Sequence, residues 1–354
     1  MIFHNKRDIL LRIFGIHAPW GKCYSFQNHK LGNILRPDHP ADIRHDTPAV
    51  EWPTLLVLLA TYGLWALGTT LAYDLSPLLA VLLTGVTIGQ FSSLQHEILH
   101  GHPFRSQALN EALAFPALTL TVPYGRFRDT HLAHHHDPIL TDPYDDPESN
   151  FFDPAVWAHL PGWIKVLFRF NNTLFGRVTL GPILGNILWL VTEAKLLRQN
   201  APGLRAAWAL HLGGLALVAL WLSFAAMPAW AYLLAAWLGH GLLKIRTFLE
   251  HRAHEAARAR TVVIEDRGPL ALLFLNNNLH VVHHMHPQVP WYRLPALYAS
   301  NRDHYLRRND GYIYRNYAQI FRAYLFRAKD PVPHPLMPDA SATVTTDAHH
   351  ARRA

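Results

Sequence analysis

Long stretches without a charged residue constrain the fold of this chain more than any other feature. Residues 52–73 and 75–96 contain no Asp, Glu, Lys or Arg over 22 residues each, and residues 206–243 contain none over 38. A transmembrane helix needs about 20 mainly apolar residues to cross the hydrocarbon core of a bilayer. The sequence therefore predicts an integral membrane protein.

Each uncharged stretch is expected to contribute to a helical hairpin. The first two stretches are separated only by a short turn around Asp74 and Pro77. As a single helix the third would be about 57 Å long, well beyond the roughly 30 Å core, so we expect it to break at Pro228. We predict an all-α fold with four transmembrane helices in two hairpins and a cytosolic or interfacial helical cap. The predicted spans are residues 52–73, 76–98, 206–225 and 228–246.

The distribution of positive charge predicts the orientation of these hairpins. All 32 Lys and Arg residues lie outside residues 52–95 and 206–243, so neither hairpin turn carries one. Cytoplasmic loops of membrane proteins are enriched in Lys and Arg. We therefore expect both turns on the outer side, and both termini and all remaining segments on the cytoplasmic side.

The segments outside the spans are assigned from composition. Residues 1–51 carry seven Lys or Arg and four Pro, which indicates a basic cytosolic arm or a plain solvated tail. Residues 52–328 form the predicted membrane domain, and residues 329–354 lack periodicity and are expected to be disordered. The single cysteine, Cys23, excludes a disulfide framework and a thiolate metal cluster. The N-terminus lacks the pattern of a cleavable signal peptide.

Three shorter segments complete the predicted membrane domain. Residues 112–125 are apolar but too short to span, so they are expected to lie at the interface or to re-enter the bilayer. Residues 142–148 form a proline-broken acidic loop, expected to be a solvated turn, with electron-donor docking or support of a metal site as the alternative. Residues 152–200 mix Trp and Phe with Lys and Arg, which is typical of amphipathic helices on a membrane surface.

Histidines recur at helical spacing in three places. Residues three and four apart share one face of a helix, so each set would present its imidazoles together. The sets are His96 and His100; His131, His134 and His135; and His280, His283 and His284. Imidazole is a common ligand of iron, copper and zinc. Eight imidazoles exceed the needs of one tetrahedral ion, which indicates two metal ions in one site.

The first set also permits a different interpretation. His96-Glu97-Ile98-Leu99-His100 matches the HExxH pattern, in which two histidines bind zinc and the glutamate acts as a base. Alone, it would indicate a zinc metallopeptidase, and a structural zinc site or a metal-binding transporter is a further alternative. These alternatives leave the other two sets unexplained.

The combination of spans and sets resembles the membrane-bound fatty acid desaturase and hydroxylase superfamily, which pairs four spans with HxxxH, HxxHH and HxxHH boxes on the cytosolic face. The resemblance covers roughly residues 50–325. The sequences Asn276-Asn277-Asn278 and Pro290-Trp291-Tyr292-Arg293-Leu294-Pro295 look like those of bacterial desaturases and carotenoid ketolases. A multi-pass protein of a bacterial cytoplasmic membrane is therefore expected.

This resemblance implies a non-haem centre of two iron ions, molecular oxygen as co-substrate, and a fatty acyl or lipid substrate. A lipid or carotenoid hydroxylase or ketolase is the alternative within the superfamily. No haem-binding His-Pro-Gly-Gly occurs, so a separate ferredoxin, rubredoxin or cytochrome would donate electrons. No protein nucleophile or general base is required, and no nucleic acid is expected as a partner.

The resemblance also implies further site residues. His251, just after the fourth span, corresponds to an additional metal ligand of the family. One asparagine among Asn276, Asn277 and Asn278 is expected near the metals, acting directly or through water, and the resemblance does not say which. Carboxylates usually orient ligating imidazoles from behind, and the candidates are Glu97, Asp137 and Glu250. His136 and His286 are expected beside the site, His240 in the bundle interior, and His211 in an ordinary core role.

Overall fold

The computed structural model describes residues 48–136 and 140–337. The basic arm 1–47 with Cys23, the candidate Asp137 and residues 338–354 lie outside the described residues. The chain is mostly helical, as predicted. Its helices and strands are α2 (Trp52–Thr69), α3 (Leu71–Leu75), α4 (Pro77–Leu99), α5 (Gln107–Ala114), α6 (Tyr124–His136), α7 (Pro154–His159), α8 (Gly162–Asn171), α9 (Leu174–Thr179), α10 (Gly181–Arg198), α11 (Leu204–Phe224), α12 (Ala229–Thr247), β1 (Val263–Ile264), α13 (Pro269–Leu273), α14 (His280–Met285), α15 (Leu294–Ser300), α16 (Arg302–Arg308), β2 (Ile313–Tyr314) and α17 (Tyr317–Tyr324).

Three helices are long and apolar enough to cross a membrane: α2, α4 and α11. The fourth expected span corresponds to α12, which is 19 residues long and carries His240, Lys244 and Arg246 toward its C-terminal end. Thus the described residues support three spans by length and composition, and a crossing by α12 remains a prediction. Large apolar side chains of these helices face outward, as expected for contact with lipid.

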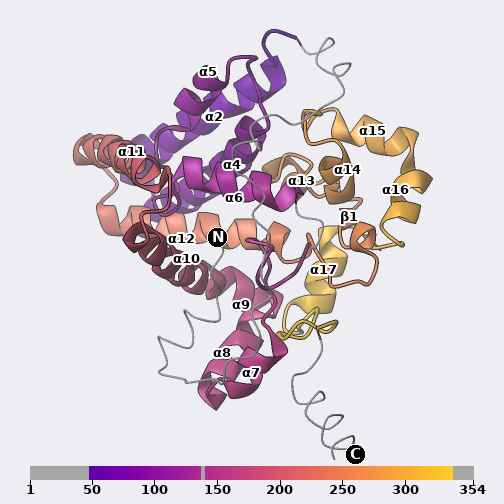
Figure 1. The fold of residues 1–354 in the computed structure, drawn as a ribbon. Coiled ribbons are helices and arrows are strands. Elements are labelled where there is room, and N and C mark those ends of the chain that lie inside the picture. The colour runs from indigo at the N-terminus through magenta and orange to yellow at the C-terminus, as the bar shows by residue number, and fades with distance from the viewer. Residues whose placement is uncertain (1–47, 137–139, 338–354) are drawn as a thin grey trace, which may run out of the picture.

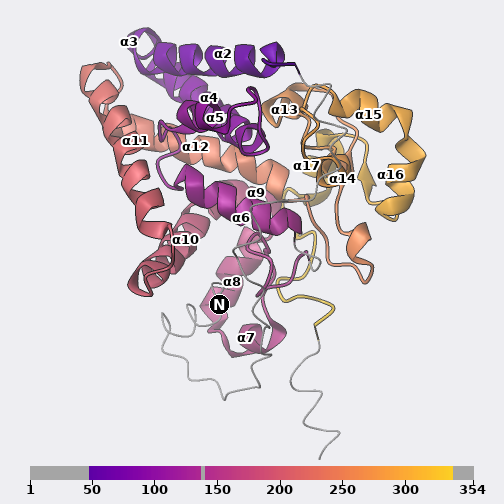
Figure 2. The same cartoon turned by 45° about the horizontal axis from the view of Figure 1, so that its top comes forward.

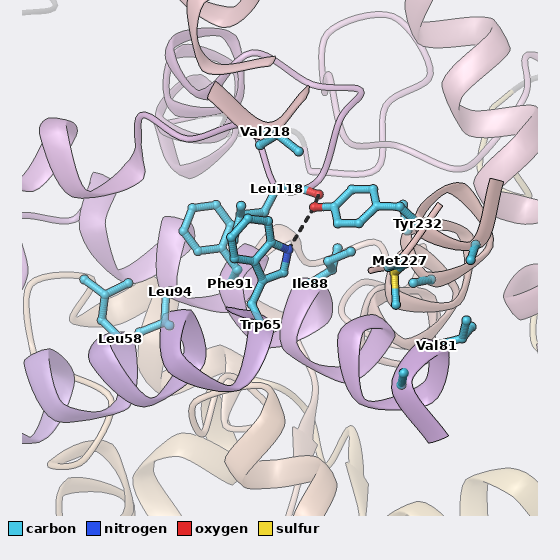
Figure 3. Packing of buried hydrophobic residues seen from close by; sticks show 14 of the residues in the cluster. Leu58, Trp65, Val81, Ile88, Phe91, Leu94, Leu118, Val218, Met227 and Tyr232 are labelled. Atoms are coloured by element: carbon cyan, nitrogen blue, oxygen red, sulfur yellow. Dashed lines mark hydrogen bonds between the residues drawn. The ribbon is translucent and has the colours of Figure 1, made fainter. Parts of the chain in front are cut away.

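Helices α4 and α12 form the centre of the helical bundle (Figure 1). Their backbones approach closely where small residues meet: a Cβ added at Gly239 would lie 2.7 Å from the carbonyl oxygen of Gly85 and 2.9 Å from Ile88 Cγ2. Small residues at helix contacts allow such close packing in membrane proteins. Around this contact, buried side chains of α2, α4 and α12 form the main apolar core (Figure 3).

The two hairpin turns lie side by side at one end of the bundle. The amide of Met227, in the turn between α11 and α12, donates to the carbonyl of Thr69 at the end of α2. Trp221 Nε1 donates to Thr69 Oγ1 over 2.9 Å. At the opposite end, the amide of Glu51 before α2 bonds the carbonyl of Pro103 after α4. Figure 2 shows both turns on the left and the cap helices α14–α16 on the right. Both turns therefore lie at the same end of the bundle, and the side of the membrane that they face remains a prediction from the charge distribution.

The apolar segment between α5 and α6 is an irregular loop, residues 115–123, that packs against α11 and α12. The carbonyl groups of its residues 118–120 accept hydrogen bonds from Tyr232 Oη, His240 Nε2 and His211 Nε2 over 2.9, 2.8 and 3.1 Å, respectively. Tyr232 in turn accepts from Trp65 (Figure 3). Backbone carbonyls buried away from water need such partners. The two histidines within the predicted third and fourth spans thus hold the loop that precedes the second histidine set.

The remaining helices form a cap on the bundle. Helices α13–α17 and the parallel pair β1–β2 pack around a second and a third apolar cluster. On another side, α8 buries Ile164 and Phe168 while Trp163 and Val166 are exposed, in agreement with the amphipathic pattern. Residues 329–337, which the sequence assigned to the tail, are described and pack against the cap.

Candidate metal centre

Nine histidine side chains from four segments meet beyond the end of α4. They form two groups, and within each group the candidate ligand nitrogens all lie within 4.8 Å of one another. The five-histidine group contains His96, His100, His131, His135 and His283. The four-histidine group contains His134, His251, His280 and His284. The structure therefore brings together all nine residues that the sequence named as candidate ligands.

The spacing within α6 and α14 explains how both helices serve both groups. In α6, His131 and His135 are four residues apart and face one group, whereas His134 faces the other. In α14 the arrangement is reversed. His280 and His284, four residues apart, face the four-histidine group, whereas His283 faces the five-histidine group. The groups are adjacent, because the rings of His135 and His284 stack with centroids 4.3 Å apart. Each HxxHH box thus splits between two neighbouring sites.

The nitrogen contacts inside the four-histidine group are compatible with a bound cation. His134 Nδ1 lies 2.8 Å from Asp146 Oδ1, and His280 Nδ1 lies 3.1 Å from Asn277 Oδ1. Both acceptors place the proton on Nδ1, which leaves a lone pair on each Nε2. Nevertheless, His251 Nε2 lies 2.9 Å from the first Nε2 and 3.1 Å from the second. In the neutral rings, the nitrogens of His134, His251 and His280 thus converge closely enough to share one metal ion.

Two carboxylates of the acidic loop hold α6 histidines from behind. Asp146 is 2% exposed and bonds His134, while Glu148 Oε1 lies 2.8 Å from His131 Nδ1. Such contacts fix the tautomer and orientation of a ligating imidazole. The sequence favoured a solvated turn here and did not single out either residue. The available signal was an acidic run within 20 residues of the second box.

Among the three asparagines, the structure distinguishes Asn277. Its Oδ1 accepts from His280, and its Nδ2 lies 3.4 Å from Glu250 Oε1. Asn276 and Asn278 instead donate to backbone carbonyls, of Trp291 and Ile264 respectively.

The two glutamate candidates make different contacts. Glu250 is buried, pairs with Arg246 Nε over 2.8 Å, and lies 3.8 Å from His280 Nδ1. Glu97 accepts from the backbone amide of Trp291 over 3.1 Å, and its carboxylate is 3.9 Å from His96 Nδ1. Glu97 therefore joins the first box to the segment after the third box more directly than it orients a ligand.

Other expected histidines lie outside both groups. His136 Nδ1 bonds the carbonyl of Leu132 within α6, and the ring of His286 packs on Tyr305. His240 bonds the loop between α5 and α6 and is not one of the grouped ligands.

Burial and neighbouring charge shift the pKa of His251 and His284 in one direction and the pKa of His134 in the other. Burial, followed by repulsion from neighbouring imidazoles, holds the pKa of His251 and of His284 well below its ordinary value. These imidazoles are neutral at pH 7, the form that binds metal ions. Burial also opposes protonation of His134, but Glu148 and Asp146 outweigh it and raise the pKa of His134 to about 9. A metal ion at its Nε2 would replace that positive charge.

Comparison with known proteins agrees with this arrangement. The family model described as fatty acid desaturase matches residues 74–316. The chain belongs to the fatty acid desaturase family. The resemblance inferred from the three histidine sets is thus confirmed, and desaturase membership identifies the chain as an oxidoreductase.

Characterised relatives of this desaturase-family chain have different products. A fatty acid desaturase of Bacillus subtilis (strain 168) is 27% identical over 276 residues, which cover 70% of this chain and 76% of the relative. A beta-carotene ketolase of Paracoccus sp. (strain N81106 / MBIC 01143) is 29% identical over 256 residues, which cover 67% of this chain and 85% of the relative. An sn-1 oleoyl-lipid 12-desaturase of Picosynechococcus sp. (strain ATCC 27264 / PCC 7002 / PR-6) is 24% identical over 295 residues, covering 77% and 82%.

Proposed function

We propose that this protein is a membrane-bound, oxygen-dependent di-iron enzyme that introduces a double bond into the acyl chain of a fatty acid or lipid. The observation that carries the proposal is the pair of adjacent histidine groups, each with converging nitrogens. One iron would be held by the five-histidine group and the other by the four-histidine group. Neutral nitrogen ligands suit iron, and nine of them are enough for two ions.

The reaction balances with one external donor. When bound, two reduced iron ions supply the oxygen activation needed to break an unactivated C–H bond. Removal of two hydrogen atoms from a –CH2–CH2– unit provides two electrons and two protons. A separate ferredoxin, rubredoxin or cytochrome provides two more electrons, solvent provides two protons, and one oxygen molecule becomes two waters.

The protein residues position the reaction and need no nucleophile or general base. Asp146, Glu148 and Asn277 orient ligating imidazoles through their Nδ1 atoms. The apolar bundle between α2, α4 and α12 supplies the environment in which a hydrocarbon chain would approach the metals. We place the metal centre on the cytoplasmic side, because it lies away from the two hairpin turns, which carry no Lys or Arg.

A carotenoid ketolase or hydroxylase is the second candidate, because one relative is a beta-carotene ketolase that the chain covers over 85% of its length. All of these reactions begin with removal of a hydrogen atom from carbon. A desaturase then removes a second hydrogen from the neighbouring carbon, a hydroxylase inserts oxygen instead, and a ketolase inserts oxygen twice at one carbon, each time with one oxygen molecule and two donor electrons, before water is lost to leave the carbonyl.

The zinc metallopeptidase interpretation is disfavoured by the geometry. His96 and His100 belong to a group with three further histidines. A catalytic zinc site instead has three protein ligands and leaves its fourth position to water or substrate. Glu97 is 3% exposed and accepts a backbone hydrogen bond from Trp291, so it is engaged away from a metal-bound water.

The test combines metal analysis with product analysis. Purified protein is expected to contain about two irons per chain, and expression in a host with a matching reductase is expected to produce new double bonds in the membrane lipids. His134→Ala and His283→Ala, one from each group, should each abolish the product, while His136→Ala should not. Ketone or hydroxyl products in a carotenoid-producing host would favour the second candidate. One zinc and no iron would refute the oxidase proposal altogether.

A further inference from the structure

A C-terminal strap, residues 329–337, follows α17 and contacts the backbone of His251 and the chain around Thr141 and Phe152. It lies beyond the residues matched by the desaturase family model, 74–316. Its strongest contact is made by Lys329, whose side chain is 9% exposed. Lys329 Nζ donates to the backbone carbonyl of His251 over 2.7 Å and to Tyr312 Oη over 3.1 Å.

His251 depends on such a contact more than the other candidate ligands do. Helix α12 ends at Thr247, and His251 lies in the irregular chain beyond it, paired with Thr261 in an isolated bridge. The other eight histidines lie on helices or at a helix end. A helix fixes the direction of its side chains through its own hydrogen bonds. The direction of the His251 side chain must instead be set by tertiary contacts of its backbone.

Lys329 and Tyr312 add side-chain contacts to the backbone bridge with Thr261. Tyr312 Oη donates to the carbonyl of Leu249 over 2.7 Å and accepts from Lys329. The carbonyls on either side of Glu250, those of Leu249 and His251, are thereby bound by two side chains that also bond each other. An ammonium group has three donors, and here they meet a carbonyl, a phenol and the carboxylate of Asp330, 2.8 Å away.

The rest of the strap reaches the same histidine group by a second route. The amide of Phe152 bonds the carbonyl of Val332, and the amide of His334 bonds the carbonyl of Phe152. His334 Nε2 lies 3.2 Å from Thr141 Oγ1. The amide of Thr141 in turn donates to Asp146 Oδ2 over 2.8 Å. Asp146 is the carboxylate that holds His134.

We infer that the C-terminal strap is a positioning element for one of the two metal ions, the ion held by the four-histidine group, and that Lys329 is its main positioning residue. Both routes end on ligands of that group: Lys329 at His251, and His334 through Asp146 at His134. The inference rests on the proposed di-iron centre and assigns to it a determinant outside the histidine boxes.

Iron content of purified variants tests this inference. Lys329→Met keeps the length and apolar stem but removes the donors, so it should lower the affinity for one of two irons by about 10- to 100-fold, as lost support of a metal ligand does. Lys329→Arg keeps a donor and should restore most of the binding. Lys165→Met is the matched control, because Lys165 Nζ also bonds a backbone carbonyl, that of Ala158, on α7. It should retain both irons.

Removal of iron by a chelator in a stopped-flow experiment distinguishes the sites. Wild-type protein should release two irons, and Lys329→Met should release one of them much faster. In the His283→Ala background, Lys329→Met should remove the remaining iron. In the His251→Ala background it should change nothing further, because that site is already lost.

Four results would overturn the inference. Lys329→Met could retain two irons as tightly as wild type, or it could lose the iron that persists in His251→Ala. Lys329→Arg could fail to restore binding. Metal-free Lys329→Met could unfold at a much lower temperature than metal-free wild type and lose both irons together, which would indicate a general role in folding. A wild-type protein without iron would instead refute the proposed function, so the two failures are distinguishable.

Discussion

Substitution of Asp146 by Asn should weaken metal binding without removing a ligand. The two carboxylate oxygens of Asp146 accept from His134 Nδ1 and the amide of Glu148 on one side, and from the amide of Thr141 on the other. Asn has one acceptor oxygen and one NH2 donor. If its oxygen faces His134, the NH2 group opposes the Thr141 amide. If the amide is reversed, its NH2 group favours the His134 tautomer whose Nε2 carries the proton and cannot bind a metal.

The expected loss of metal affinity follows from these two orientations of the Asn side chain. The first leaves two buried donors facing each other, at a cost of about 1–3 kcal/mol for the unsatisfied groups. The second loses a charge-assisted hydrogen bond and the correct tautomer of one ligand. Residues that support metal ligands typically contribute 10- to 100-fold in affinity, which corresponds to about 1.4–2.7 kcal/mol at 25 °C. We therefore expect Asp146→Asn to lower the affinity of the four-histidine group by about that factor.

Competition against a chelator of known affinity measures this loss in detergent-solubilised protein. Asp145→Asn is the control, because Asp145 lies in the same loop, its backbone amide bonds Asp142, and its carboxylate has no histidine partner among the described contacts. It should bind metal as wild type does. An affinity of Asp146→Asn within twofold of wild type, in folded protein, would refute the assignment of Asp146 as the group that fixes the His134 tautomer.

Two stability predictions follow from buried contacts far from the ligand nitrogens. Glu193→Ala should lower stability by about 3–5 kcal/mol, because it leaves Arg126 of α6 without the buried carboxylate it binds through Nε and Nη2. Glu111→Ala removes the partner of Arg128 in a half-exposed ion pair and should lower the free energy of unfolding by no more than about 1 kcal/mol. Equal unfolding temperatures for Glu193→Ala and Glu111→Ala would contradict this difference. Gly239→Ala should cost about 1–3 kcal/mol because α4 must move away. Gly63→Ala meets no atom within 4 Å and should be neutral or stabilising, so similar unfolding temperatures for both glycine variants would disprove the close α4–α12 contact.

The arrangement of the two HxxHH boxes determines which segments must be in place to form each histidine group. Each box gives a pair of residues four apart to one group and its third histidine to the other, and the two boxes do so in opposite senses. The five-histidine group therefore needs α4, α6 and α14, whereas the four-histidine group needs α6, α14 and the chain that follows α12. Movement of α6 alone would disturb both groups. The bond between Arg126 and Glu193, which ties α6 to α10, is one such constraint.

Much of the membrane part was predictable because its signals are local. An uncharged stretch of 22 residues must bury its backbone groups in a helix if it enters a bilayer, so composition alone locates α2 and α4. The same holds for α11, whereas α12 is interrupted by polar residues near its end and is less certain from length and composition. The histidine sets were also visible, because spacing of three and four along one helix brings imidazoles to one face.

The amino-acid sequence by itself predicted the helical membrane class, a common side for the three boxes and eight candidate ligands, because each depends on periodicity within one segment or on the placement of charge. The ninth candidate, His251, came from the family resemblance. Only the tertiary structure decided how the nine divide into groups of five and four, which asparagine contacts a candidate ligand, and that Asp146, Glu148 and Lys329 contact His134, His131 and the backbone of His251, respectively. These contacts join residues from different segments. Lys329 and His251, for example, are 78 positions apart, and no periodicity connects residues that meet only when the chain is folded.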